Sequence, residues 1–323
     1  MIPPRAELVA HARDTIARGS KSFAAASKLF DPVTRERAWL LYAWCRACDD
    51  LADGQDMGHG MQRLDDAPAR LLLIRERTAA ALAGQPTGDP AFDALGVVAA
   101  EVGLPHSLVY DVIDGFQLDA DGWQPVTEGD LYQYCYHVAG AVGGLMAVVM
   151  GVPAADRDTL DRACDLGLAF QLANIARDVR EDADVGRCYL PREWLAEQGI
   201  DPADPMATPD RVAVLARRMA ARAALHEDSA RVGAARLPWR SAWAVLAAAD
   251  IYGGIARKVA AAGPAAWAKR QTTSKGEKIA AIARAFVAAR WRPAPDTPRD
   301  AVLWTRALRA TNVIPAKAEI SRL

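Results

Sequence analysis

Apolar side chains recur every three or four residues along most of this 323-residue chain, whereas the alternating pattern typical of strands is nearly absent. This period places apolar groups on one face of an α-helix, and such faces are buried by packing helix on helix. The sequence therefore predicts an all-α fold. We expect helices over residues 5–18, 20–29, 32–53, 61–83, 90–102, 105–118, 128–151, 155–184, 208–232, 239–262 and 275–290.

Turn-forming residues separate these helices at four main places, residues 84–90, 121–125, 199–209 and 292–298. None of the four is long or biased enough to be an interdomain linker, and the chain shows no solenoid-type repeat. We expect one domain over residues 1–323, with its core at about 10–290 and a loosely ordered tail after about residue 311. The segment from Thr127 to Asp130 predicts a capping box at the start of a helix.

Charge and cysteine content restrict the class of protein. The chain has 39 Lys and Arg against 40 Asp and Glu, which argues against a nucleic-acid-binding protein. Its five cysteines are an odd number without a compact disulfide framework, and they favour reduced thiols in the cytoplasm. The first residues lack the apolar core of a signal peptide. Residues 131–155 carry no Asp, Glu, Lys or Arg, but their tyrosines and glycines predict a buried helix and not a membrane span.

Two acidic pairs, each spaced by four residues, fall on predicted helices. The first pair, Asp49 and Asp53, continues the stripe of Ala38, Tyr42 and Arg46 along one helix face. This stripe lies beside a largely apolar one. The two carboxylates are therefore not on an obvious solvent face.

The second pair ends a stripe whose character changes along the helix. The stripe begins with small apolar residues, becomes amide-polar and ends acidic, through Cys164, Gly167, Gln171, Asn174, Asp178 and Asp182. Such a gradient suits a cavity that is apolar at its base and ionic at its mouth.

Each pair alone is most simply a pair of solvated surface acids. Two pairs on inward stripes, each with an arginine one turn away, favour a function because buried carboxylates need partners or a metal. Carboxylates at this spacing suit Mg²⁺, which also bridges to substrate phosphate. A diphosphate beside bare carboxylates would cost about 4 kcal/mol for each like-charge contact at about 4 Å, so bridging cations are required. Further phosphate oxygens could be bound by Lys21, Arg46, Arg177, Arg187 and Arg270.

Seven segments together resemble the squalene/phytoene synthase family, and within it the bacterial phytoene synthases. They are GSKSF (19–23), LYAWCR (41–46), DDLAD (49–53), YCYHVAG (134–140), QLANIARD (171–178), GRCYLP (186–191) and TTSK (272–275). Any one of them alone is a weak signal, but their order and spacing are specific. The resemblance covers the chain up to about residue 290.

This resemblance implies the isoprenoid synthase fold, in which one domain of helices surrounds a deep central cavity. The implied metal ligands for Mg²⁺, or alternatively Mn²⁺, are Asp49, Asp53, Asn174, Asp178 and Asp182. The four aspartates are also implied to be catalytic, together with Tyr134, which lies where the family has a tyrosine beside the reacting carbons. The implied diphosphate contacts are Ser20, Lys21, Tyr42, Arg46, Gln171, Arg177, Tyr252 and Arg270. Lys269 replaces Arg270 if the match is shifted by one residue, and Gly19 stands where a dehydrosqualene synthase has His.

The implied reaction is the head-to-head condensation of two geranylgeranyl diphosphates to phytoene in carotenoid biosynthesis. Metal-assisted ionisation gives an allylic cation, and attack by the second substrate gives the cyclopropyl intermediate prephytoene diphosphate. Loss of the second diphosphate, rearrangement and loss of a proton then give phytoene. No reductant is required, so no nicotinamide cofactor is expected. Two alternatives stay open: a squalene or dehydrosqualene synthase that uses farnesyl diphosphate, and a non-catalytic assembly or lipid-binding relative.

A cationic intermediate must be kept from water, so the cavity wall should be apolar. Candidate lining residues are Phe23, Val138, Ala141, Val142, Leu145, Gly167, Leu168 and Phe170. Such apolar substrates and products also predict peripheral contact with the inner membrane, and association with other carotenoid-pathway enzymes is a further expectation.

Two other features receive the simpler interpretation. Cys45 and Cys48 match C-x-x-C, but they lie in mid-helix without a second ligand pair, which disfavours a zinc or redox site. His137 is most simply a helix histidine with a satisfied hydrogen bond, with a catalytic role as the alternative.

Overall fold

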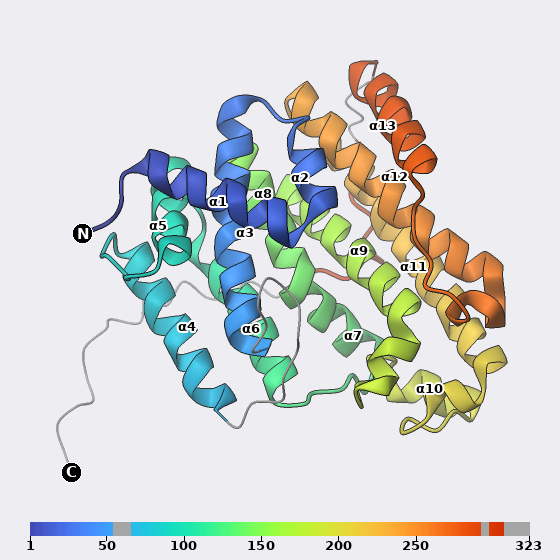
Figure 1. Cartoon of the computed structure of the whole chain (residues 1–323). Coiled ribbons are helices and arrows are strands. Elements are labelled where there is room, and N and C mark those ends of the chain that lie inside the picture. Colours follow the sequence, from blue (N-terminus) through green and yellow to red (C-terminus); the bar gives the residue numbers. More distant parts are fainter. Residues whose placement is uncertain (54–65, 292–296, 307–323) are drawn as a thin grey trace, which may run out of the picture.

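The computed structural model describes residues 1–53, 66–291 and 297–306, except the side chains at positions 21, 22, 25 and 53. Every regular element in these ranges is helical, which confirms the predicted fold class (Figure 1). The elements are α1 (Arg5–Gly19), α2 (Lys21–Ser27), α3 (Pro32–Asp53), α4 (Ala67–Leu82), α5 (Pro90–Val102), α6 (His106–Ala120), α7 (Glu128–Cys135), η1 (Tyr136–Gly140), α8 (Ala141–Val149), α9 (Arg157–Asp184), α10 (Arg192–Gln198), η2 (Pro205–Ala207), α11 (Pro209–Ala234), α12 (Trp239–Ala262), η3 (Gly263–Trp267) and α13 (Lys275–Arg290).

Local sequence signals set several helix starts. Thr127 Oγ1 accepts from the backbone N–H of Asp130, and the Asp130 carboxylate accepts from the N–H of Thr127 at 2.8 Å, so the predicted capping box is confirmed. Ser274 and Glu277 form a second capping box at α13. The short helix α10 was not predicted, because it spans only seven residues. Part of the helix predicted over 61–83 lies outside the described residues, which resume before α4.

The single helix predicted over 128–151 is wrong in one respect, because the π turn η1 separates α7 from α8. A π turn holds one extra residue and shifts the faces of the helix that follows. Tyr136 donates to a carboxylate oxygen of Asp111 at 2.5 Å, and His137 Nδ1 lies 2.8 Å from the backbone carbonyl oxygen of Asp111. These bonds to α6 hold the extra residue in place, and periodicity does not detect them.

Helix α9 is central and packs against α8, α11 and α12. Its contact with the η1–α8 segment is a direct approach of two backbones. A Cβ atom on Gly167 would lie 2.3 Å from the carbonyl oxygen of Ala139, and one on Gly143 would lie 2.4 Å from that of Ala163. Only glycine fits at such positions, so the glycines noted in the sequence set the spacing of these helices.

One hydrophobic core extends from Leu8 in α1 to Ala289 in α13. The packed part of the chain continues past the expected boundary at about 290, because residues 297–306 form a strap on the outside of α9. In this strap Arg299 pairs with Asp165 and Arg306 pairs with Asp161. The expected loose tail after residue 311 lies outside the described residues. Among the described helices, none combines the length and apolar character needed to cross a bilayer.

Candidate active site

An apolar cavity of about 400 Å³ lies between α2, α8, α9, α11 and α12. Its lining on α9 runs from Thr159 to Asn174, a helical rise of about 22 Å at 1.5 Å per residue. Gln171 and Asn174 mark the polar end of this stripe, one turn before Asp178. Thr159 marks the other end of this stretch of α9, and Phe30, Met150 and Leu237 also line the cavity.

The cavity wall confirms five of the eight predicted lining residues, namely Phe23, Val138, Val142, Gly167 and Phe170. The other three predictions are wrong, since Ala141, Leu145 and Leu168 are buried in the hydrophobic core instead. Two of the three errors fall on α8, directly after the π turn η1.

The first acidic position lies near the end of α3. Arg46 Nη1 lies 3.2 Å from a carboxylate oxygen of Asp49 and 3.9 Å from one of Asp50. The side chain of Asp53 lies outside the described residues, so the first metal pair stays a prediction. Burial raises the pKa of Tyr42, and the neighbouring Arg46 opposes that shift only in part.

Two buried polar atoms at this position are unsatisfied. Within the described part of the chain, the Tyr42 hydroxyl and Arg46 Nε make no hydrogen bond of normal geometry. A buried polar atom without a partner is costly, and a bound anion would satisfy both groups. Gly19 leaves the room for this arrangement, because a Cβ atom there would lie 2.6 Å from the Tyr42 hydroxyl. The predicted diphosphate contacts Tyr42 and Arg46 therefore lie side by side.

The second acidic position is near the end of α9. Asp178 accepts hydrogen bonds from Arg177 Nε at 2.6 Å and from Arg270 Nε and Nη2 at 3.0 and 2.9 Å. Burial alone would raise the pKa of Asp178, but these guanidinium groups outweigh it and lower the pKa. Burial and the charge of Asp178 raise the pKa of Asp182 to about 7, against the opposing effect of Arg187. The surroundings of Asp182 disfavour its anionic form, and a bound cation would stabilise that form.

These donors fit a divalent metal. Asn174, Asp178 and Asp182 share one face of α9, and their oxygens are the ligand type that Mg²⁺ prefers. The C-terminal ends of α3 and α9, which carry the two acidic pairs, both point to the lower edge of Figure 1. Shared binding of metal and diphosphate by the two pairs stays a prediction.

The remaining predicted contacts occupy different places. Gln171 and Tyr252 line the cavity, and the Tyr252 ring stacks on Phe170 at 4.2 Å between centroids. Ser20 Oγ accepts from the backbone N–H of Phe23 at 3.2 Å and so caps the start of α2. The side chain of Lys21 lies outside the described residues.

Tyr134 is buried outside the cavity lining, in a cluster that the sequence did not predict. Tyr134 and Tyr189 both donate to Asp119, at 3.0 and 2.9 Å, and their rings stack at 4.8 Å. Burial and the charge of Asp119 raise the pKa of Tyr134. Asp119 also contributes to the raised pKa of Asp182, so the cluster adjoins the acidic end of α9. Tyr189 lies in the GRCYLP segment, one of the seven segments of the family resemblance, whereas Asp119 lies in none of them.

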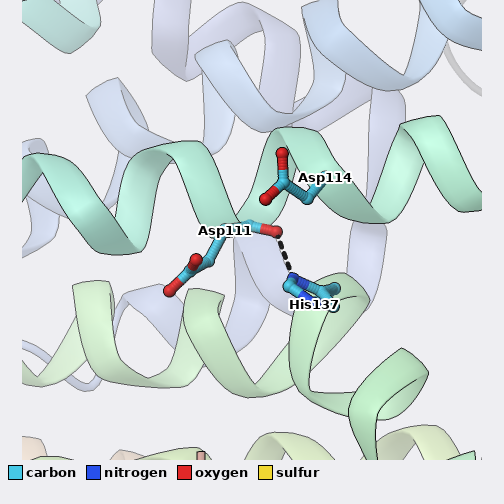
Figure 2. A group of neighbouring side chains, drawn as sticks. All are labelled: Asp111, Asp114 and His137. Atoms are coloured by element: carbon cyan, nitrogen blue, oxygen red, sulfur yellow. Dashed lines mark hydrogen bonds between the residues drawn. The ribbon is translucent and has the colours of Figure 1, made fainter. Parts of the chain in front are cut away.

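A second group of possible metal ligands consists of Asp111, Asp114 and His137, whose ligand atoms lie within 4.8 Å of one another. In Figure 2 the two carboxylates point away from each other, and His137 is bonded to the backbone carbonyl of Asp111. Asp111 accepts from Tyr136 at 2.5 Å, and Asp114 pairs with Arg75 at 2.9 Å. Each group already has a protein partner, so this cluster ties η1 to α6. The interpretation of His137 as a satisfied helix histidine is confirmed.

The two cysteines of the C-x-x-C pattern are free and lie in mid-helix on α3. Burial raises the pKa of the Cys45 thiol to about 12 and that of Cys48 well above its ordinary value. A thiol in this state is a poor nucleophile and a poor metal ligand, as the sequence indicated.

Helices line an apolar cavity whose stripe on α9 ends in Gln171 and Asn174, one turn before the carboxylate of Asp178 and its arginine partners. This combination defines the class of isoprenoid synthases.

Comparison with known proteins narrows the class to a family. The model of the squalene/phytoene synthase family matches residues 16–277, and the chain belongs to this family. It is 47% identical to phytoene synthase from Pseudescherichia vulneris and 45% identical to 15-cis-phytoene synthase from Pantoea ananas. Each of these alignments covers 93% of this chain and 98% of the relative.

Solved structures agree with this assignment. A ligand-bound dehydrosqualene synthase superposes with a TM-score of 0.77 at 26% identity, covering 88% of this chain and 98% of that one. A squalene synthase from Alicyclobacillus acidocaldarius gives 0.72 at 26% identity, covering 80% and 95%.

Proposed function

We propose that this chain condenses two geranylgeranyl diphosphates head to head to phytoene through prephytoene diphosphate, as a step of carotenoid biosynthesis. Bacterial relatives at 45–47% identity carry the name phytoene synthase, and they match this chain over nearly their whole length. The solved structures named above belong to enzymes for squalene and dehydrosqualene, so the length of the prenyl chain needs its own argument.

Cavity length is the observation that carries the proposal. An extended chain advances about 1.2 Å per bond, so the sixteen main-chain carbons of a twenty-carbon prenyl group, joined by fifteen bonds, span about 18 Å. A fifteen-carbon group has twelve such carbons and spans about 13 Å. The lining of α9 from Thr159 to Asn174 extends about 22 Å, which accommodates the longer chain.

One group of residues would bind the diphosphates and metal, and another would keep water away from the carbocation. Arg46, Arg177 and Arg270 present guanidinium groups beside the two acidic positions, where they can bind phosphate oxygens. Asp49, Asp53, Asn174, Asp178 and Asp182 would hold Mg²⁺. Bound Mg²⁺ neutralises charge on the leaving diphosphate. The apolar walls from α8, α11 and α12 exclude water from the carbocation and position the two chains.

The substrate chemistry extends the proposal to the surroundings of the enzyme. A twenty-carbon diphosphate partitions into lipid by its tail, and phytoene has no polar group at all. Peripheral contact with the inner membrane, and association with enzymes that supply the substrate or use the product, follow from the same proposal.

Product analysis tests this function directly. Purified protein with Mg²⁺ is incubated in detergent with geranylgeranyl diphosphate or with farnesyl diphosphate, and the hydrocarbons are identified by mass spectrometry. We expect a forty-carbon hydrocarbon, phytoene, from the first substrate. A thirty-carbon hydrocarbon as the sole product would overturn the assignment of chain length, and no hydrocarbon from either substrate would overturn the enzymatic function.

A further inference from the structure

Helix α13 is apolar on two opposite faces. Ala281, Ala285 and Ala289 form its buried stripe, and the helix packs against α12. On the outer face Ile279 is 69% exposed and Val287 is 53% exposed. Apolar side chains grouped on an exposed face are typical of a surface that meets a protein or a membrane, so the outer face indicates a further contact.

Aromatic residues extend this outer face. Trp291, directly after the helix, is 70% exposed, and Phe286 and Trp239 are 39% and 43% exposed. The rings of Trp239 and Phe286 meet edge to face at 6.1 Å, so α12 contributes to the same surface. We call this surface the α13 patch, and it consists of Trp239, Ile279, Phe286, Val287 and Trp291.

The charge around the patch is positive although the chain as a whole carries −1. Helix α13 has one acidic residue, Glu277, and four basic ones, Lys275, Lys278, Arg284 and Arg290. Lys258 pairs with Glu277 at 2.7 Å, so this acid is neutralised. Asp250 on α12 pairs with Arg231 and with Arg284, so three of the four bases on α13 make up the excess. The patch thus offers apolar side chains flanked by a basic excess, which complements an anionic surface.

The patch also lies close to the cavity. Leu237 lines the cavity, and Trp239 follows it by two residues. Helix α12 lines the cavity with Ala244 and Ala248 and packs against α13. Figure 1 shows α13 at the outer edge of the molecule, beyond α12. One helix therefore separates the patch from the binding site for the prenyl chain.

We infer that the α13 patch docks on the surface of an anionic lipid bilayer, with its apolar side chains among the lipids and its bases at the headgroups. Exposed aliphatic and aromatic residues beside Lys and Arg are typical of helices that lie in the membrane interface. This inference adds a surface to the proposed function and rests on it for the apolar ligand. A second copy of the chain fits less well, because a helix of 16 residues presents only about 240 Å², against about 800 Å² per partner in a stable dimer.

Vesicle binding tests the inference without any substrate. Full-length protein is sedimented with vesicles of phosphatidylcholine alone or mixed equally with phosphatidylglycerol. The variant combines Ile279→Gln with Val287→Gln, and the matched control combines Val33→Gln with Leu72→Gln, whose residues are 52% and 57% exposed elsewhere. We expect the α13 variant to lose at least ~10-fold in partitioning onto the mixed vesicles, and the control to bind like the parent.

Several outcomes would overturn docking at this patch: equal binding by parent and α13 variant, equal loss in the control, or tight binding to pure phosphatidylcholine. A concentration-dependent dimer that the α13 variant abolishes would assign the patch to a second copy instead. Product formation from detergent-dispersed geranylgeranyl diphosphate is measured in parallel. The rate of product formation in both variants should stay within about two-fold of the parental rate, because none of the substituted residues lines the cavity. A protein that binds vesicles but forms no phytoene would refute the proposed function and leave the docking surface in place.

Discussion

Asp178 shows how single residues at the site are poised. Its two oxygens accept from Arg177 and Arg270, so one carboxylate holds two guanidinium groups together. One turn further along α9, burial and the negative charge of Asp178 raise the pKa of Asp182 to about 7. In the middle of α3, the Tyr42 hydroxyl is buried without a hydrogen bond of normal geometry to any described residue. A raised carboxylate pKa and a buried hydroxyl without a partner are both expected where a charged ligand binds.

At the residue scale we predict that Asp178→Asn lowers phytoene formation by at least ~10²-fold, the scale for the loss of one preorganised electrostatic group. The amide keeps the shape of the carboxylate but loses the charge that orients two arginines and would bind metal. Turnover of geranylgeranyl diphosphate at saturating Mg²⁺ is the measurement. Asp184→Asn, at the exposed end of the same helix, is the control and should retain parental turnover. Near-normal activity in Asp178→Asn would contradict the role assigned to this residue.

Helix α9 is the element in which three features meet. Its inner face lines the cavity, its C-terminal end carries the acids, and its outer face holds the strap over residues 297–306. The strap is fastened at Asp165, a buried carboxylate that accepts from His226 at 2.8 Å, Ser229 at 2.6 Å and Arg299 at 2.7 Å. The strap therefore holds α9 from outside, while the glycine contacts of α8 hold it from inside.

At the element scale we predict that Asp165→Asn lowers the free energy of unfolding by about 3–5 kcal/mol at neutral pH, because it leaves Arg299 buried without its counter-ion. Burial alone would raise the pKa of Asp165, but the bonds from Arg299 and His226 outweigh it and lower the pKa. A lowered folded-state pKa stabilises the protein above the unfolded value of about 3.9, and this stabilisation is lost as pH falls through the folded value.

The measurement is urea unfolding of parent and variant over a range of pH. The difference between them should be full near pH 7 and should shrink below about pH 4. Asp228→Asn, an exposed acid on α11, is the control and should change stability by less than about 0.5 kcal/mol. A difference that grew in acid would contradict the assigned direction of the pKa shift.

For the whole molecule, substrate choice depends on a cavity that no one helix forms. Its wall combines α2, α8, α9, α11 and α12, which are far apart in sequence. Along α9, Ala163 lies about 16 Å from Asn174, between the lengths of a fifteen-carbon and a twenty-carbon chain. A bulky side chain at this depth would shorten the cavity and leave its polar end unchanged.

At this scale we predict that Ala163→Phe shifts preference from geranylgeranyl to farnesyl diphosphate by at least ~10-fold in kcat/KM, because the longer chain can no longer extend fully. The two substrates are compared singly and in competition, and the products are identified by mass. Ala163→Ser, which adds little volume, is the control and should keep the parental preference. An unchanged preference in Ala163→Phe would mean that the chain takes another path.

The sequence by itself determined the helices, the acidic pairs and the family, because these depend on local periodicity and on residue types at fixed spacing. It predicted correctly that Gly167, Gln171 and Asn174 face one cavity, since residues on one helix keep a known angular relation, whereas Cys164, the first member of the predicted stripe, is buried in the core instead. Only the tertiary structure decided the π turn at Tyr136, the Asp119 cluster, the strap and the exposed outer face of α13. Each of these depends on how segments distant in the chain pack together. Such packing produces no periodic pattern in the sequence.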